Sequence, residues 1–111
     1  MATELVLLSD VPLTEEVHHR AYKRLGITGE MLEWLDGQVC TLHDETGQHI
    51  LTVHAPMVIH DAREAAAALA DPPEAFGLWS DIMVPFDNTE KGRTVAEAIA
   101  AEIGGLIRER I

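Results

Sequence analysis

Six histidines and one cysteine are the side chains of this sequence best suited to chemistry, and their spacing limits what that chemistry is. His43 and His49 flank a short polar segment, with Asp44 beside the first of them. If the flanking residues pair as a hairpin, the two imidazoles are cross-strand neighbours, and two imidazoles with a carboxylate suit zinc or a similar ion. A longer loop would place the rings on opposite faces. No Cys-x-x-Cys or His-x-x-x-His spacing supports a metal site, so surface histidines are the favoured interpretation and we expect no metal or other cofactor.

Cys40 and His54 form a second candidate pair, a thiol nucleophile with an imidazole base on the same sheet face. A nucleophilic cysteine needs a pKa lowered by a cation or a helix N-terminus, whereas the nearby Glu33 would raise it. A small buried thiol is therefore the favoured interpretation. No other catalytic motif is present, so whether the chain is an enzyme stays open, and a non-catalytic role is favoured.

The charge of the chain limits its partners. Eight Lys and Arg residues against nineteen Asp and Glu residues give a net charge of −11. Such a surface repels nucleic-acid phosphates and anionic membranes, so we expect neither as a partner. The charge permits docking to a basic protein, although solubility alone explains it.

The length of 111 residues and a hydrophobic content of 47% predict one domain over residues 1–111. A single cysteine excludes an internal disulfide framework and favours a reducing compartment. The first residues lack the basic region and the apolar core of a secretory signal, and the aliphatic run 5–8 is too short to span a bilayer. We therefore expect a cytoplasmic protein.

Hydrophobic periodicity and turn residues predict the order βα-βββ-αβ-α, with a C-terminal edge strand as an open alternative. The predicted strands are 4–8, 31–35, 38–43, 49–54 and 78–84, the helices are 14–25, 61–70 and 87–103, and the edge strand is 106–111. A two-layer α+β sandwich follows, with a mixed, mainly antiparallel sheet and helices on one face. The order resembles that of ferredoxin-like α+β sandwiches with an extra strand in the central hairpin. The resemblance is topological, carries no motif and implies no function.

Asp36-Gly37 fixes the register of the first hairpin, because this dipeptide favours a two-residue turn with positive φ angles. It places Trp34 opposite Val39 and Leu32 opposite Thr41. A helical turn over residues 29–35, capped by Thr28, is the alternative. The turn signal favours the strand.

The second hairpin, closed through a Glu45–Gly47 loop, would place His43 opposite His49 and Val39 opposite Val53. These pairings sort the side chains onto two faces. The predicted core face comprises Leu32, Trp34, Val39, Leu51 and Val53. The second face comprises Met31, Leu35, Leu42 and Ile50 among Glu33, Gln38, Cys40, Thr52 and His54.

The second face is too apolar to be a solvent face, and a contiguous apolar patch commonly marks a binding surface. We predict that Met31, Leu35, Leu42 and Ile50 form a homodimer interface. The alternative is a small-ligand pocket on the same face around Cys40, Thr52 and His54. A one-residue slip in register would exchange the two faces.

Overall fold

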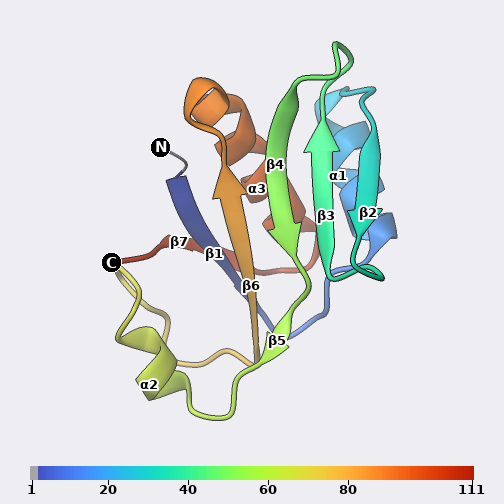
Figure 1. Ribbon diagram of the computed structural model, residues 1–111. Coiled ribbons are helices and arrows are strands. Elements are labelled where there is room, and N and C mark those ends of the chain that lie inside the picture. Colours follow the sequence, from blue (N-terminus) through green and yellow to red (C-terminus); the bar gives the residue numbers. More distant parts are fainter. Residues whose placement is uncertain (1–2) are drawn as a thin grey trace.

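The aliphatic run Leu5 to Leu8 forms the centre of the molecule. It lies in β1 (Thr3–Ser9), which pairs on one side with β6 (Leu78–Val84) and on the other with β7 (Leu106–Glu109). The computed structural model, which describes residues 3–111, is an α+β fold with an antiparallel seven-stranded sheet and three α-helices (Figure 1). The strand order is β2-β3-β4-β6-β1-β7, and β5 (Met57–Val58) pairs with one end of β6.

The predicted fold class is confirmed, with two differences. All pairs among the described strands are antiparallel, so the sheet is not mixed. The ferredoxin-like order is not confirmed, since β1 lies between β6 and β7 and is antiparallel to both. The predicted C-terminal edge strand is present as β7.

Helix α1 (Glu15–Leu25) begins and ends where its sequence predicts. The Thr14 side chain accepts a hydrogen bond from the Val17 amide at 3.4 Å, and Gly26 closes the helix with a φ of 70°, which favours glycine. Val17 and Ala21 are buried against the sheet. The predicted apolar stripe therefore sets the orientation of this helix.

Helix α3 (Thr89–Glu102) packs beside α1 on the same face of the sheet (Figure 1). Val95 and Ile99 are completely buried, as their spacing predicts. The predicted start of this helix at residue 87 is wrong, because Asp87 lies in a short 3-10 helix (Phe86–Asn88) and the cap of α3 has no side-chain hydrogen bond.

Helix α2 (Ala62–Ala66) is shorter than the predicted 61–70. Its start is correct, since the Asp61 side chain accepts hydrogen bonds from the Arg63 and Glu64 amides. Its end differs because the amides of residues 67–69 donate to carbonyls three residues back, as in 3-10 turns, and the Ala70 amide then donates to the Glu109 carbonyl. The backbone after α2 is thus held by the C-terminal strand.

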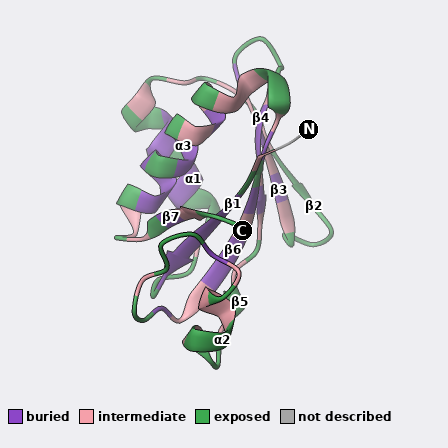
Figure 2. Cartoon of the chain, turned by 90° about the vertical axis from the view of Figure 1, so that its left-hand side faces the viewer, coloured by how far each residue is buried: buried purple, intermediate pink, exposed green. Residues whose placement is uncertain are grey.

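The two faces of the sheet are covered differently. Helices α1 and α3 cover one face, whereas the segment 59–76, which includes α2, covers only one end of the other (Figure 2). Under that segment lies a small second core: Val6, Leu8, Leu69, Phe76 and Trp79. The remaining strands of that face are β2 (Met31–Trp34), β3 (Val39–His43) and β4 (His49–His54).

Candidate functional site

The sheet face turned away from α1 and α3 is uncovered over β2, β3 and β4 (Figure 2). One row of side chains crosses it, because Leu32 pairs with Thr41, Thr41 with Thr52, and Thr52 with Met83. Alternate residues of a strand point to the same face, so these four side chains share one surface.

A second row runs beside the first. Trp34 pairs with Val39, which in turn pairs with His54. The Trp34 indole donates a hydrogen bond to the Thr41 hydroxyl at 3.0 Å and so ties the two rows together. The indole ring is 52% exposed, although tryptophan is among the residues that gain most from burial.

The uncovered surface carries large apolar side chains, and charged residues lie only at its border, where Glu4 pairs with Met83 and Asp81 lines the neighbouring hollow. Leu32 and Met83 are 40% and 38% exposed. None of its positions is Asp, Glu, Lys or Arg, although these residues make up 24% of the chain. We call this surface the open face, and its residues are Leu32, Trp34, Val39, Thr41, His43, His49, Thr52, His54 and Met83.

The predicted interface falls only in part on the open face. Leu42 and Ile50 are completely buried under the helices, and Cys40 is 8% exposed on the same side. Met31 packs against the edge of that core. These four placements were wrong, because the residues fill the core. Of the other predicted residues, Thr52 and His54 lie on the open face, and Leu35 lies in the adjoining turn with 71% exposure.

A β-bulge explains the error. The pairs His43–His49 and Trp34–Val39 are as predicted, but the register shifts by one residue between His43 and Leu42. Leu42 therefore pairs with Leu51, and Ile50 becomes the extra residue of the longer strand. Ile50 and Leu51 are both buried, which a strictly alternating strand does not allow. Leu32, Trp34 and Val39 consequently lie on the open face and not in the core.

The turn between β2 and β3 is more strained than the predicted two-residue turn. Leu35 and Asp36 both have positive φ angles, 52° and 56°, followed by Gly37 at 85°. The left-handed region costs an L-residue such as leucine about 1–2 kcal/mol. An exposed leucine is thus held at the edge of the open face in an unfavourable backbone conformation.

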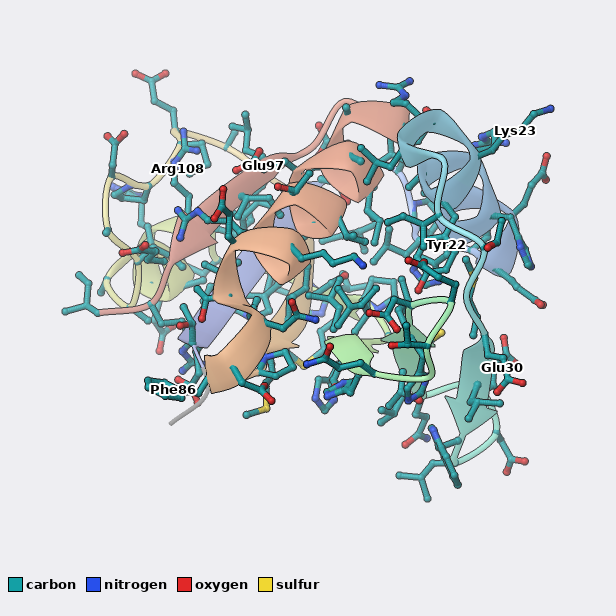
Figure 3. All side chains as sticks on the ribbon, turned by 90° about the horizontal axis from the view of Figure 1, so that it is seen from above. Tyr22, Lys23, Glu30, Phe86, Glu97 and Arg108 are labelled. Carbon is teal, nitrogen blue, oxygen red and sulfur yellow. The ribbon has the colours of Figure 1, made fainter. Side chains whose placement is uncertain are left out.

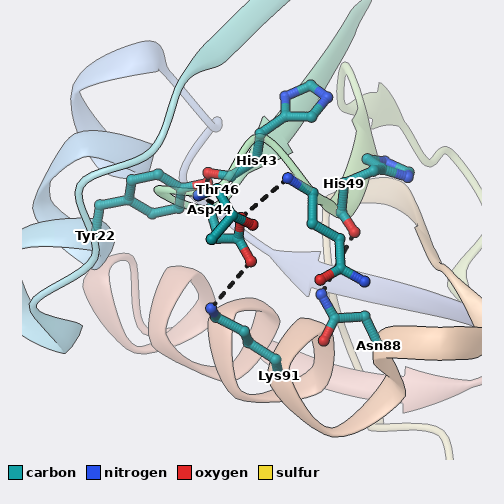
Figure 4. Close-up of polar contacts among 8 residues, drawn as sticks. Tyr22, His43, Asp44, Thr46, His49, Asn88 and Lys91 are labelled. Atoms are coloured by element: carbon teal, nitrogen blue, oxygen red, sulfur yellow. Dashed lines mark hydrogen bonds and ion pairs between the residues drawn. The ribbon is translucent and has the colours of Figure 1, made fainter.

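A polar cluster beside the second hairpin is fully occupied by structural contacts (Figure 4). Asp44 accepts hydrogen bonds from Thr46 and Gln48 and forms a 3.3 Å ion pair with Lys91. The hydrogen bond from the Thr46 hydroxyl, with smaller contributions from its other donors, lowers the pKa of Asp44 to about 2. This carboxylate holds the loop and has no capacity left for a ligand.

Tyr22 joins the same cluster from α1, pointing toward the end of β3 (Figures 3 and 4). Its hydroxyl donates to the His43 carbonyl at 2.6 Å, and burial raises its pKa above the usual value. The neutral hydroxyl therefore ties α1 to β3.

The candidate metal ligands His43 and His49 are cross-strand neighbours with ring centroids 5.6 Å apart. The Asp44 carboxylate is engaged elsewhere, and the His49 ring makes a 2.8 Å hydrogen bond with Thr52. Within residues 3–111, no group of three or more His, Cys, Asp or Glu side chains is arranged to hold a metal ion.

The proposed nucleophile–base pair is not formed. Cys40 pairs with Val53, while His54 pairs with Val39, so the two side chains point to opposite faces. Burial, followed by the charges of Glu33 and Glu15, raises the pKa of the Cys40 thiol to about 11. The thiol is protonated at neutral pH, as the sequence position of Glu33 predicts.

The chain has no match among protein-family models, curated proteins or solved structures. Over the described part of the chain, no helix has the length and apolar character needed to cross a membrane. The geometry of the open face is therefore the main observation from which a function can be argued.

Proposed function

We propose that this chain is a small non-catalytic binding module that forms a homodimer through its open face. The observation that carries the proposal is an exposed surface of large apolar and uncharged polar side chains on a chain with a net charge of −11. Exposed apolar patches on soluble proteins commonly mark association sites. A cytoplasmic location, predicted from the single cysteine, is part of this proposal.

The charge distribution favours a second copy over a basic protein. A basic partner would be attracted to acidic surface, and the open face itself has none, with Glu4 and Asp81 only at its border. Two copies of this chain repel each other overall, so association costs least where neither copy carries charge. Two such faces related by a two-fold axis would pack as a pair of sheets about 10 Å apart.

The shape of the face supports association. A hollow of about 490 Å³ borders it, lined in part by Val39, His54 and Met57. In protein interfaces, aromatic side chains seated in hollows supply much of the binding energy. Trp34, which projects from the neighbouring strand, is the side chain suited to fill the hollow of a second copy.

The backbone conformation of Leu35 also supports an interface at the open face. An exposed leucine with a positive φ costs folding stability, and such strain is commonly found at functional positions. Contact with a second copy would explain why an apolar residue occupies a turn position that suits asparagine or glycine.

The proposal is tested by sedimentation equilibrium of the wild-type chain and of Trp34→Glu. We expect a dimer at micromolar concentration for the wild type and a monomer for Trp34→Glu, because the substitution places a charge in a desolvated surface. Phe86→Glu is the matched control. Phe86 is 76% exposed and lies on α3's side of the molecule, away from β2 (Figure 3), and the substitution changes the net charge equally.

Phe86→Glu should dimerise like the wild type, and circular dichroism should show that both variants are folded. A wild-type chain that is strictly monomeric at micromolar concentration contradicts the proposal. Equal loss of dimer in both variants would assign the effect to net charge and not to the open face.

A further inference from the structure

A small cleft lies on the other side of the sheet, between the first turn of α1 and strands β2 to β4. Its volume is about 140 Å³, enough for a few non-hydrogen atoms. Leu13 and Val53 supply apolar wall, and Glu15, His18, Glu33 and Cys40 supply polar groups. His54, Ala55 and Pro56 line both this cleft and the hollow beside the open face, whereas the polar groups Glu15, His18, Glu33 and Cys40 line the cleft alone.

His18 is the unusual member of this lining. It is only 5% exposed, and neither ring nitrogen has a hydrogen-bond partner among the described residues. Leaving a buried donor or acceptor unpaired costs about 1–3 kcal/mol. Burial, reinforced by the neighbouring His19 and opposed by Glu15, lowers the pKa of His18 to about 4. The ring is therefore neutral at pH 7, with one donor and one acceptor nitrogen that the protein itself leaves unused.

The charges around the cleft have one sign. Glu15 and Glu33 line it, and no Lys or Arg does. Among the described residues, the basic group in contact with Glu15 is the exposed His19, at 3.4 Å. The negative charge of both glutamates also acts on the Cys40 thiol. A ligand in this position is therefore favoured if it is positively charged.

An organic cation suits the cleft better than a metal ion. The Cys40 thiol is protonated at neutral pH and is not a ready thiolate ligand. The cleft residues are not arranged as a metal-binding group of three or more. The side chains of Leu13 and Val53, which form the apolar wall, offer no ligating atom to a bare ion, but they can contact a short hydrocarbon chain.

We propose that this cleft binds a small alkylammonium ion. The ammonium group lies between the carboxylates of Glu15 and Glu33. Both ring nitrogens of His18 are buried in the structure, so the ring turns toward the cleft to accept a hydrogen bond from the ammonium group. The alkyl chain lies against Leu13 and Val53. The bound cation thereby supplies a partner for the unpaired imidazole.

The test uses n-butylammonium chloride, titrated into the full chain at pH 7 and followed by two-dimensional amide NMR. We expect saturable shift changes confined to residues 13–18, 33–40 and 53–56. Sodium butyrate, which has a similar chain and the opposite charge, should give no saturable change. Saturation by butyrate at the same residues would overturn the proposal, as would the absence of a saturable response to butylammonium.

Charge-neutral variants locate the site. Glu33→Gln should raise the dissociation constant about tenfold, because it removes one of the two carboxylates. Glu97→Gln is the matched control, since Glu97 is exposed on the outer side of α3 (Figure 3), and it should leave binding unchanged. An equal effect of the two variants would show that only overall charge attracts the probe.

The role of the imidazole is tested with His18→Leu. Binding should weaken about tenfold or more, while the melting temperature without ligand should not fall, because an unpaired polar group is replaced by an apolar one. Unchanged binding would overturn the role of His18. Should this variant fail to fold, the pair Glu33→Gln and Glu97→Gln still decides the proposal. A parallel titration with zinc chloride that saturates the same residues would overturn the proposal, because the ligand of the cleft would then be a metal ion and not an organic cation.

Discussion

At the scale of single residues, the two adjacent histidines of α1 show that the burial of a side chain depends on its position around the helix. His19 is exposed and contacts Glu15, whereas His18 is buried beside the predicted stripe. The sequence interpretation treated both as surface residues, which was wrong for His18. A signal was available, because His18 precedes the buried Tyr22 by one helical turn and widens the apolar stripe on that side.

The burial of His18 predicts a loss of stability in mild acid. The unfolded chain takes up this proton near pH 6.5 and the folded chain only near pH 4. Between these values the unfolded state binds more protons, so the free energy of unfolding falls as the pH falls, by about 3 kcal/mol at most. Urea denaturation at a series of pH values measures this loss.

His18→Leu should remove the dependence between pH 6.5 and pH 4, and His19→Leu, the exposed control, should retain it. The titration of Asp44 does not interfere with this measurement. Its pKa of about 2 lies below its unfolded value of 3.8, so its contribution to the free energy of unfolding is lost only at lower pH. A wild-type stability that stays constant down to pH 4 would contradict the assigned burial of His18.

At the scale of helices and strands, the sequence predicts the features that local signals determine, namely helix ends and the register of a hairpin. Thr14 and Gly26 set the ends of α1, and the residues around Asp36-Gly37 set the register of β2 and β3. The α2 segment shows the limit of such signals. The backbone after this helix is held by a hydrogen bond from the Ala70 amide to the Glu109 carbonyl, far away in the sequence.

The set of side chains on the open face could not be predicted, for a related reason. The bulge at Ile50 has no sequence signal, and it reverses the faces of every residue paired beyond it. Thr52 and His54 were nevertheless placed correctly on an uncovered face. Their role in binding stays a prediction.

Close packing of α3 on the sheet gives a test at this scale. A Cβ atom on Gly92 would lie 2.7 Å from the Ile50 carbonyl oxygen and 2.5 Å from a methyl group of Val84. Although alanine is the better helix former, we expect Gly92→Ala to lower the free energy of unfolding by about 1–3 kcal/mol, because α3 must move away from the sheet. Chemical denaturation measures the change.

Glu97→Ala on the exposed side of the same helix is the control, and it should change stability by no more than about 0.5 kcal/mol. A Gly92→Ala variant as stable as the wild type would show that α3 does not lie this close to β4 and β6.

At the scale of the whole molecule, charge and apolar surface are segregated. The net charge of −11 resides outside the open face, since the ion pair Arg24–Glu102 lies on the helix side and Arg110–Asp81 lies at the border of the face. A homodimer formed through the open face would bring two negatively charged bodies together without any attractive charge at the contact.

This arrangement predicts that salt strengthens the dimer. Raising the ionic strength from 0.01 M to 0.15 M shortens the screening length from about 30 Å to about 8 Å and weakens the repulsion between the two copies. The dissociation constant, measured by sedimentation equilibrium, should fall several-fold over this range. A dimer that weakens as salt is added would contradict the proposal, since it would indicate ion pairs across the contact.

The position of β1 has a consequence for synthesis on the ribosome. Among the described strands of the sheet it is made first, yet the strands that pair with it are β6 and β7, which are made last. Its aliphatic core, Leu5 to Leu8, thus emerges long before any strand is available to cover it. Pairing of such distant segments is slow compared with hairpin closure. We therefore expect Leu5 to Leu8 to stay without strand partners on the ribosome until β6 and β7 have been translated.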